Sequence, residues 1–385
     1  MNESTPPEMF GRKTKILFSQ WTWIPSSLRW ILLFAVLTVP QVLWGGANAP
    51  ATPQPTPGKM WYAAVGAQSK DKGRQALAFL PNEIWIHAAN PNIIPLEGDS
   101  ITWTIDVDEP HTVTFLADGE AQNRPLFSAA PTPAPSPSPP TFDGSKSVSS
   151  TGDPASIAKG NIFTVQFPTP GDFKLVCLFH NNMTGVVHVL PFDAPLPHDQ
   201  DFYDRQAADQ RRDLLSDRDG RLVAAGQQHG ECAAHDSLKA RVVAAGIGEI
   251  SATAGGTQTL SVMRFIDDNI QIRAGDTVEW TNQDPVTPHT VTFGTEPDPE
   301  NLPVPSSSPS PLFVDAEGVL HADIKSRGDS VNSGFLMATL QDQTGNKQTP
   351  IGFTRFRITF HTPGVFPYIC GLHDILGMTG TVTVH

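Results

Sequence analysis

Hydrophobic and polar residues alternate over many short stretches of the chain. Runs such as "SITWTI" (residues 100–105), "FTVQF" (163–167), "TVEWT" (277–281) and "FRITF" (356–360) place β-branched or aromatic side chains at every second position. A period of two puts one face of a strand in a core and the other face in solvent. Gly-Asp and Pro-Gly pairs separate the runs and supply turns. The pattern predicts an all-β fold of antiparallel strands, arranged as Greek-key β-sandwiches.

The alternating stretches occur twice in the same order. "FTVQFPTPGDFKLVC" at 163–177 matches "FRITFHTPGVFPYIC" at 356–370, and the segment "PHTVTF" is present in both halves. Internal repetition on this scale indicates two tandem copies of one domain. We place the two domains at residues 59–192 and 239–385.

The join between the repeats, residues 193–238, has another pattern. It mixes Asp and Arg closely among helix-forming residues, as in "DRQAADQRRDLL", so we expect a charged helical linker. Within it, His229, Cys232 and His235 stand at three-residue steps that could line one helix face and bind a soft metal. We favour the alternative that Cys232 is a buried or spare thiol, which could pair between chains.

The N-terminus carries a short apolar run, "WILLFAVLTVPQVL", at residues 30–43. Its length and the basic residues before it suit a signal peptide better than a membrane span. "ANA" at 47–49 is typical of a cleavage site, but Pro50 hinders cleavage there. Residues 1–49 are therefore predicted to be a signal peptide or a retained N-terminal anchor. Either way we expect an exported protein, in the periplasm or another extracytoplasmic space.

Charge and cysteine content narrow the function. The formal net charge of −13 argues against nucleic-acid binding and favours partners with basic surfaces. Three cysteines in 385 residues are too few for a disulfide scaffold. The oligomeric state stays open.

The most specific chemical signal is a set of soft ligands at the same strand end in each repeat. The sequences are "CLFHNNM" in the first repeat and "CGLHDILGM" in the second. Their ligand residues are Cys177, His180 and Met183, and Cys370, His373 and Met378. A type 1 copper site needs a thiolate, two imidazoles and a weak axial thioether. The repeated "PHTVTF" supplies the missing imidazole, from His111 and His289.

These motifs resemble those of the cupredoxins, the blue copper proteins typified by plastocyanin, amicyanin, pseudoazurin and azurin. The spacing in "CGLHDILGM" is similar to the plastocyanin and pseudoazurin pattern, and that in "CLFHNNM" to the shorter amicyanin pattern. The resemblance implies two type 1 copper ions per chain, one in each repeat. The implied ligands are His111, Cys177, His180 and Met183 at one site, and His289, Cys370, His373 and Met378 at the other.

The resemblance also implies a function and one structural detail. Cupredoxins transfer single electrons between protein partners such as cytochromes, here basic ones, without binding a substrate at the metal. The electron usually passes through an exposed histidine of the Cys-His-Met loop, here His180 or His373. Nearby apolar residues such as Phe179, Leu372 and Ile375 would form a small docking patch. Cupredoxins usually have Asn after the first histidine. This chain has Thr112 and Thr290, whose hydroxyls could tie the ligand loops together in a similar way.

Two other functions stay open. A copper nitrite reductase or small multicopper oxidase also joins cupredoxin domains, but it needs further histidines beside the cysteine or in His-x-His pairs. The neighbours here are Val176, Leu178, Ile369 and Gly371, and no His-x-His occurs in the sequence. A copper carrier or sensor must release its ion, which a rigid thiolate site does poorly.

Overall fold

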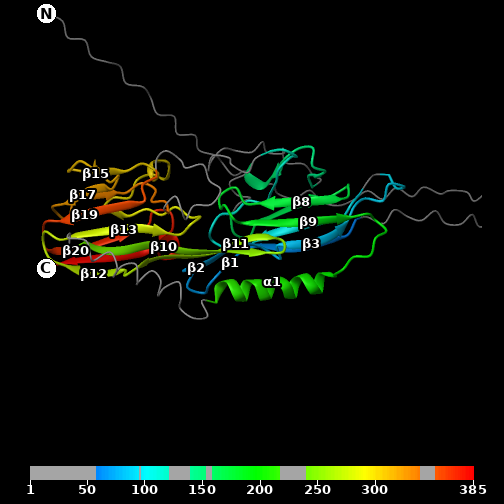
Figure 1. The fold of residues 1–385 in the computed structure, drawn as a ribbon, viewed down its shortest axis with the longest axis horizontal. Helices are drawn as coiled ribbons and strands as arrows, with labels where there is room; N and C mark the ends of the chain where they lie inside the picture. Colours follow the sequence, from blue (N-terminus) through cyan, green and yellow to red (C-terminus); the bar gives the residue numbers. More distant parts are fainter. Residues whose placement is uncertain (1–57, 95–96, 121–138, 153–157, 217–239, 339–351) are drawn as a thin grey trace, which may run out of the picture. The chain divides into compact units, whose positions relative to one another are not determined.

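Figure 1 shows the structure, a computed structural model that describes residues 58–94, 97–120, 139–152, 158–216, 240–338 and 352–385. The predicted leader, Cys232 and the rest of its "HGECAAH" segment lie outside these residues. Within them the fold is β apart from one α-helix and short 3-10 turns, which confirms the predicted β character. No helix in the described ranges is both long and apolar enough to cross a membrane.

The first half of the chain forms strands β1 to β9. Their bounds are β1 (Met60–Gln68), β2 (Arg74–Leu80), β3 (Glu83–His87), β4 (Ser100–Ile105), β5 (Thr114–Phe115), β6 (Val148–Ser149), β7 (Ile162–Gln166), β8 (Gly171–Val176) and β9 (Thr184–Leu190). Five of them make one sheet in the order β3-β9-β8-β5-β6. The β8–β9 and β5–β8 pairs are antiparallel, and they bring the ends of three strands together at one edge.

The second half repeats this plan with strands β10 to β21. Their bounds are β10 (Ala240–Thr253), β11 (Gly256–Ile266), β12 (Asn269–Ile272), β13 (Thr277–Gln283), β14 (Thr292–Phe293), β15 (Ser306–Ser308), β16 (Phe313–Val314), β17 (Leu320–Ile324), β18 (Ser330–Asn332), β19 (Arg355–Phe360), β20 (Gly364–Ile369) and β21 (Thr379–Val384). Six of them form a sheet in the order β12-β21-β20-β14-β18-β15.

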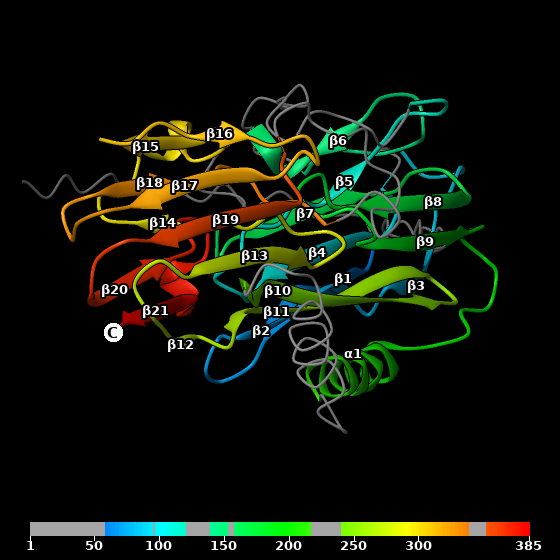
Figure 2. The same ribbon diagram turned by 60° about the vertical axis from the view of Figure 1, so that its left-hand side comes forward.

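The remaining strands of both halves join in one sheet. Its order among the described residues is β16-β17-β19-β13-β10-β11-β2-β1-β4-β7. The halves meet where β11 pairs antiparallel with β2, with Thr259 opposite Leu77 and Val262 opposite Arg74 (Figures 1 and 2). Backbone hydrogen bonds therefore cross directly from one half to the other, which the sequence did not predict.

Each half has its own core between its two sheets. Trp103 of β4 and Trp280 of β13 stand at equivalent positions of the repeat, and both are fully buried. Each packs against the phenylalanine of its "PHTVTF" segment, Phe115 or Phe293, at ring-centroid distances of 5.7 and 5.8 Å. The inward faces of the alternating strands therefore build two similar cores.

The described part of the linker, residues 193–216, contains one helix, α1 (Gln200–Leu215). Asp199 caps its N-terminus, because the carboxylate accepts a hydrogen bond from the backbone N–H of Phe202. Tyr203 is buried, and its hydroxyl accepts a hydrogen bond of 2.8 Å from the backbone N–H of Trp85 in β3. The helix is thus fixed to the first half. The domain boundaries and the Greek-key connectivity stay predictions.

Candidate metal centres

The sheet register brings the predicted ligands of the first half together. Cys177 directly follows β8, and Met183 directly precedes β9. The antiparallel pair of Thr114 in β5 with Val176 in β8 places His111, three residues before β5, beside the end of β8. His180 lies in the turn between β8 and β9. Three residues of the β8–β9 connection and His111 from the segment before β5 therefore converge at one edge of the sheet.

The first group is compact and buried. The Sγ atom of Cys177 lies 3.9 Å from Nδ1 of His111 and 3.7 Å from Nδ1 of His180, and the two Nδ1 atoms are 3.1 Å apart. All three ligand atoms lie within 4.8 Å of one another. Two imidazole nitrogens and one sulfur therefore point at a common centre.

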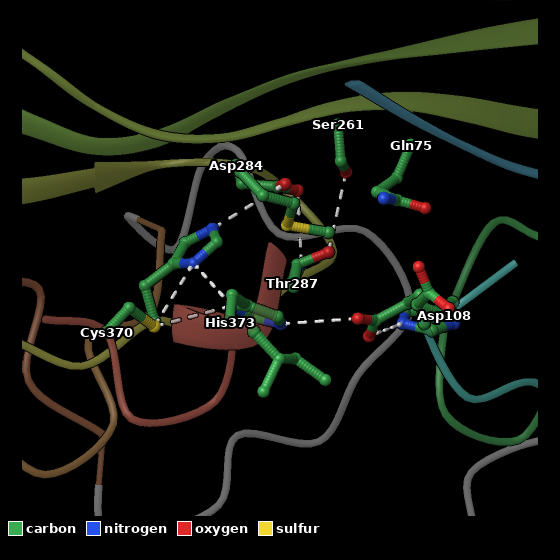
Figure 3. Close-up of polar contacts among 12 residues, drawn as sticks. Gln75, Asp108, Ser261, Asp284, Thr287, Cys370 and His373 are labelled. Atoms are coloured by element: carbon green, nitrogen blue, oxygen red, sulfur yellow. Dashed lines mark hydrogen bonds and ion pairs between the residues drawn. The ribbon is translucent and has the colours of Figure 1, made fainter. Parts of the chain in front are cut away.

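The second group has the same geometry. The Sγ atom of Cys370 lies 3.9 Å from Nδ1 of His289 and 3.4 Å from Nδ1 of His373, and the Nδ1 atoms are again 3.1 Å apart. Figure 3 shows Cys370 and His373 side by side in this group. Pairing of Thr292 in β14 with Ile369 in β20 produces the convergence, as in the first half.

The two methionines close the ligand loops. The backbone N–H of Cys177 donates to the carbonyl oxygen of Met183, and that of Cys370 to Met378, both at 3.0 Å. Both methionine side chains are fully buried in the same core as their cysteine. A thioether is thus available beside each His-Cys-His group.

The threonines tie the two ligand loops together, as predicted. The Thr112 hydroxyl accepts a hydrogen bond of 2.8 Å from the backbone N–H of Leu178, and the Thr290 hydroxyl accepts one of 2.7 Å from Gly371. The backbone N–H of each threonine donates to the cysteine sulfur, at 3.4 Å for Cys177. These bonds fix the cysteine next to the first histidine and stabilise negative charge on sulfur.

Electrostatics favours ligand forms in both groups. Burial raises the pKa of the Cys177 thiol, but hydrogen bonds and charge from His111 and His180 outweigh burial and bring the pKa well below its usual value. The pKa of Cys370 is lowered in the same way. Burial lowers the pKa of His180, yet its contacts with Cys177 and a carboxylate raise it to about 10. Each cysteine is therefore a thiolate, the form that binds metals.

Two glycines allow the first histidine of each group to approach the sheet. Gly66 in β1 has φ of 72°, and a Cβ atom there would lie 2.8 Å from Nε2 of His111. Gly246 in β10 has φ of 80°, and a Cβ atom there would collide with Nε2 of His289. The pairing of each strand shifts register at its glycine. Sequence reasoning missed this pair, although "AAVGA" and "VAAGI" repeat it.

The surroundings of the first histidines differ between the halves. The Asp284 carboxylate is buried, and its Oδ2 atom lies 3.8 Å from Nε2 of His289 (Figure 3). Burial raises the pKa of Asp284, but His289 lowers it below the usual range, so this carboxylate is charged. Nε2 of His111 and Nε2 of His289 are both buried without a hydrogen-bond partner among the described residues. Burial lowers the pKa of each histidine, but at His289 the contacts with Asp284 and Cys370 outweigh burial and raise the pKa. This difference could not be predicted from the sequence.

The expectation that the loop histidines are exposed is wrong. His180 and His373 are each only 3% exposed. Nε2 of His180 lies 3.1 Å from Oε1 of Glu109, and Nε2 of His373 lies 3.7 Å from Oε2 of the same residue. Of the apolar residues expected around them, Ile375 is 69% exposed, so a contact surface remains beside the second loop.

Three described histidines outside the predicted sites have acidic partners. His188 contacts Asp172 and Glu83, His321 contacts Asp315, and His361 contacts Asp323. Among the described residues, the only groups of three or more His, Cys, Asp or Glu side chains that could hold a metal ion are the two above.

The donor set fits copper. One thiolate and two imidazoles in a buried group, with a thioether from the same loop, are the ligands of blue copper sites, whereas Mg²⁺ and Ca²⁺ prefer oxygen. Residues 252–385 match the model of the copper binding proteins of the plastocyanin/azurin family. No curated protein matches the sequence.

Similar solved structures include three cupredoxins. A mutant of amicyanin with Cu(I) is 18% identical, with 38% of this chain and 82% of that chain covered and a TM-score of 0.20. Oxidised plastocyanin from Dryopteris crassirhizoma is 18% identical, with coverages of 37% and 99% and a TM-score of 0.19. A purple cupredoxin from Nitrosopumilus maritimus is 19% identical, with coverages of 37% and 98% and a TM-score of 0.18.

The β fold and the two buried His-Cys-His groups define a copper-binding protein with two candidate sites in one chain. The predicted resemblance to the cupredoxins is confirmed for residues 252–385, which match the plastocyanin/azurin model. The first half repeats its strand order and its metal group.

Proposed function

We propose that this protein is an exported blue copper protein that transfers single electrons between redox partners. The observation that carries the proposal is the pair of buried His-Cys-His groups, each with a methionine in the same loop. A ligand set supplied entirely by the protein leaves no open position for a substrate, so copper there would exchange electrons without binding a reactant. His111, Cys177, His180 and Met183 would hold one copper, and His289, Cys370, His373 and Met378 the other.

The rigidity of the groups supports the same function. Thr112 and Thr290 fix the loops on either side of each cysteine, and the histidine rings are enclosed by the core. A site that keeps one geometry in both oxidation states needs little rearrangement when an electron arrives. The same rigidity opposes release of the ion, which counts against a carrier or sensor.

A copper nitrite reductase or small multicopper oxidase is the competing proposal. Such an enzyme needs a second class of copper with its own histidines. The residues beside Cys177 and Cys370 are aliphatic or glycine, which supports a protein without turnover.

Partner and location are part of the proposal. The net charge of −13 would speed encounters with a basic cytochrome at low salt. The exposed Ile375, with the half-buried Leu372 beside it, offers an apolar contact near the second site. The apolar run at residues 30–43 supports export, by a cleaved signal peptide or a retained anchor.

Spectroscopy of the purified protein tests the proposal. We expect an intense blue colour when the protein is oxidised, a type 1 EPR signal and two copper ions per chain. Cys177→Ser and Cys370→Ser should each remove one copper and about half the colour, because each replaces the only thiolate of one site. An unchanged spectrum in either variant, or sustained consumption of nitrite or dioxygen at about 1 per second or faster, contradicts it.

A further inference from the structure

Glu109 lies between the two metal groups and belongs to neither. It precedes Pro110 and His111 in the first half, and it is only 6% exposed. Its Oε1 atom is 3.1 Å from Nε2 of His180, and its Oε2 atom is 3.7 Å from Nε2 of His373. One carboxylate therefore contacts a loop histidine of each half.

A buried carboxylate in this place is costly without those contacts. Removing a charge from water costs several kcal/mol unless opposite charges or hydrogen bonds compensate it. Each histidine directs Nδ1 at its cysteine and Nε2 at Glu109. The carboxylate therefore orients both rings from the side opposite the thiolates, as outer carboxylates do for metal-bound histidines.

The repeat does not explain Glu109. The first half reads "DVDEPHT" and the second reads "DPVTPHT", so Val286 and Thr287 occupy this stretch in the second half. Val286 is buried in the core of the first half. Among the described residues, Glu109 is thus the one carboxylate that contacts a loop histidine of both groups.

Contacts between the two halves hold His180 and His373 at a fixed separation. The β2–β11 pair joins the halves through the backbone. Arg264 adds a second connection, since its guanidinium donates to the carbonyl oxygen of Leu376 in the second ligand loop and to that of Asp71 in the first half, both at 2.7 Å. The distance between His180 and His373 is therefore set by ordered structure on both sides.

We propose that Glu109 is a positioning residue that connects the two copper sites, so that an electron passes between them within one chain through His180, Glu109 and His373. The path consists of two imidazole rings and one carboxylate, with gaps of 3.1 and 3.7 Å. In that step, one copper would be oxidised from Cu(I) to Cu(II) and the other would be reduced from Cu(II) to Cu(I). No bond is made or broken and no proton is required. The inference rests on the electron-transfer function proposed above.

Reduction potentials in single-site proteins test the connection. Cys177→Ser leaves only the second site and Cys370→Ser only the first. Adding Glu109→Gln to each should raise the potential of the remaining site, because a neutral amide replaces an anion that stabilises Cu(II). Asp108→Asn is the matched control: it removes a carboxylate one residue away that pairs with Lys72 and Lys159 (Figure 3 labels Asp108). Its effect on the second site should be clearly smaller.

Electron exchange within the two-site protein is the second measurement. One site is reduced by a short pulse, and rapid freezing with EPR follows Cu(II) at each site. We expect a first-order exchange that is independent of protein concentration and at least tenfold slower in Glu109→Ala than in Asp108→Asn. If the alanine variant does not fold, Glu109→Gln, which keeps the size of the side chain, decides through the potentials.

Two results would overturn the inference. One is a second-site potential that does not move on Glu109→Gln in the Cys177→Ser protein. The other is an internal exchange rate in Glu109→Ala within twofold of the Asp108→Asn control. Either result refutes the connection alone, provided that the unmutated protein holds two blue coppers. Absence of blue copper from the unmutated protein refutes the proposed function itself.

Discussion

The hydrogen bond between Thr290 and Gly371 should stabilise the second site measurably. Thr290 is fully buried, and its hydroxyl accepts the N–H of Gly371 at 2.7 Å. Thr290→Val keeps the shape and removes the acceptor. A buried donor without a partner costs about 1–3 kcal/mol, and the added methyl group returns at most about 0.8 kcal/mol. Since Gly371 is only half-buried, we expect the free energy of unfolding to fall by about 1–2 kcal/mol.

Urea unfolding of the metal-free protein measures this loss, as a lower midpoint at unchanged slope. Thr112→Val removes the equivalent 2.8 Å bond to Leu178 in the first half. The two sites share no partner, so the double variant should lose about 2–4 kcal/mol, the sum of the single losses. Hydrogen exchange reports the bond directly, because the Gly371 amide should exchange faster in Thr290→Val.

Thr290→Ser is the control, because it keeps the hydroxyl and removes a methyl group. It lowers stability through packing but should leave the Gly371 amide protected. Unchanged exchange of that amide in Thr290→Val would refute the role assigned to the hydroxyl. So would equally fast exchange in the serine and valine variants, since packing alone would then explain both.

Two further predictions concern charge. Asp284→Asn should raise the reduction potential of the second site by tens of millivolts, since about 60 mV corresponds to each 1.4 kcal/mol. Spectroelectrochemistry should find the potential of the first site unchanged. A shift in the potentials of both sites contradicts a local effect of Asp284. The second prediction concerns the metal-free protein, in which the pKa of His180 is about 10 and that of Cys177 lies well below 9.0. From pH 6.5 to 9.0 this His-Cys pair therefore holds one proton in both the folded and the unfolded state. As the pH rises from 9.0 through about 10, the unfolded pair loses that proton first, so the folded state becomes less stable. Urea unfolding should therefore show lower stability at about pH 10 than at about pH 8, and equal stability would contradict the raised pKa of His180.

The repeated parts of each site could be predicted from the sequence. Strand alternation placed Cys177 and Cys370 at strand ends, and the shared "PHTVTF" identified the partner histidines. The role of Thr112 followed from its position after His111. These features recur because each half builds the same group from the same local pattern, and repetition separates them from ordinary core residues.

Features that occur once could not be predicted in this way. Glu109 has Thr287 at its position in the second half, and Asp284 has the exposed Asp106 at its position in the first. Only the fold shows that Glu109 and Asp284 are buried against ligand histidines. The pairing of β2 with β11 also has no sequence signal, because alternation indicates which face of a strand is buried and does not specify its neighbour. The burial of His180 and His373 follows from that pairing, since it brings the two loops together.

Glu109 and Asp284 give the two otherwise similar metal sites different electrostatic surroundings. Glu109 contacts a loop histidine of both groups, so its charge acts on each. Asp284 acts on the second group alone, whereas in the first half the buried Val107 and Nε2 of His111 both lie against Gly66. A nearby negative charge stabilises Cu(II) over Cu(I) and so lowers the reduction potential. Copper in the second site would then be the stronger reductant, and an electron that reached it from a partner near Ile375 would move on towards the first site.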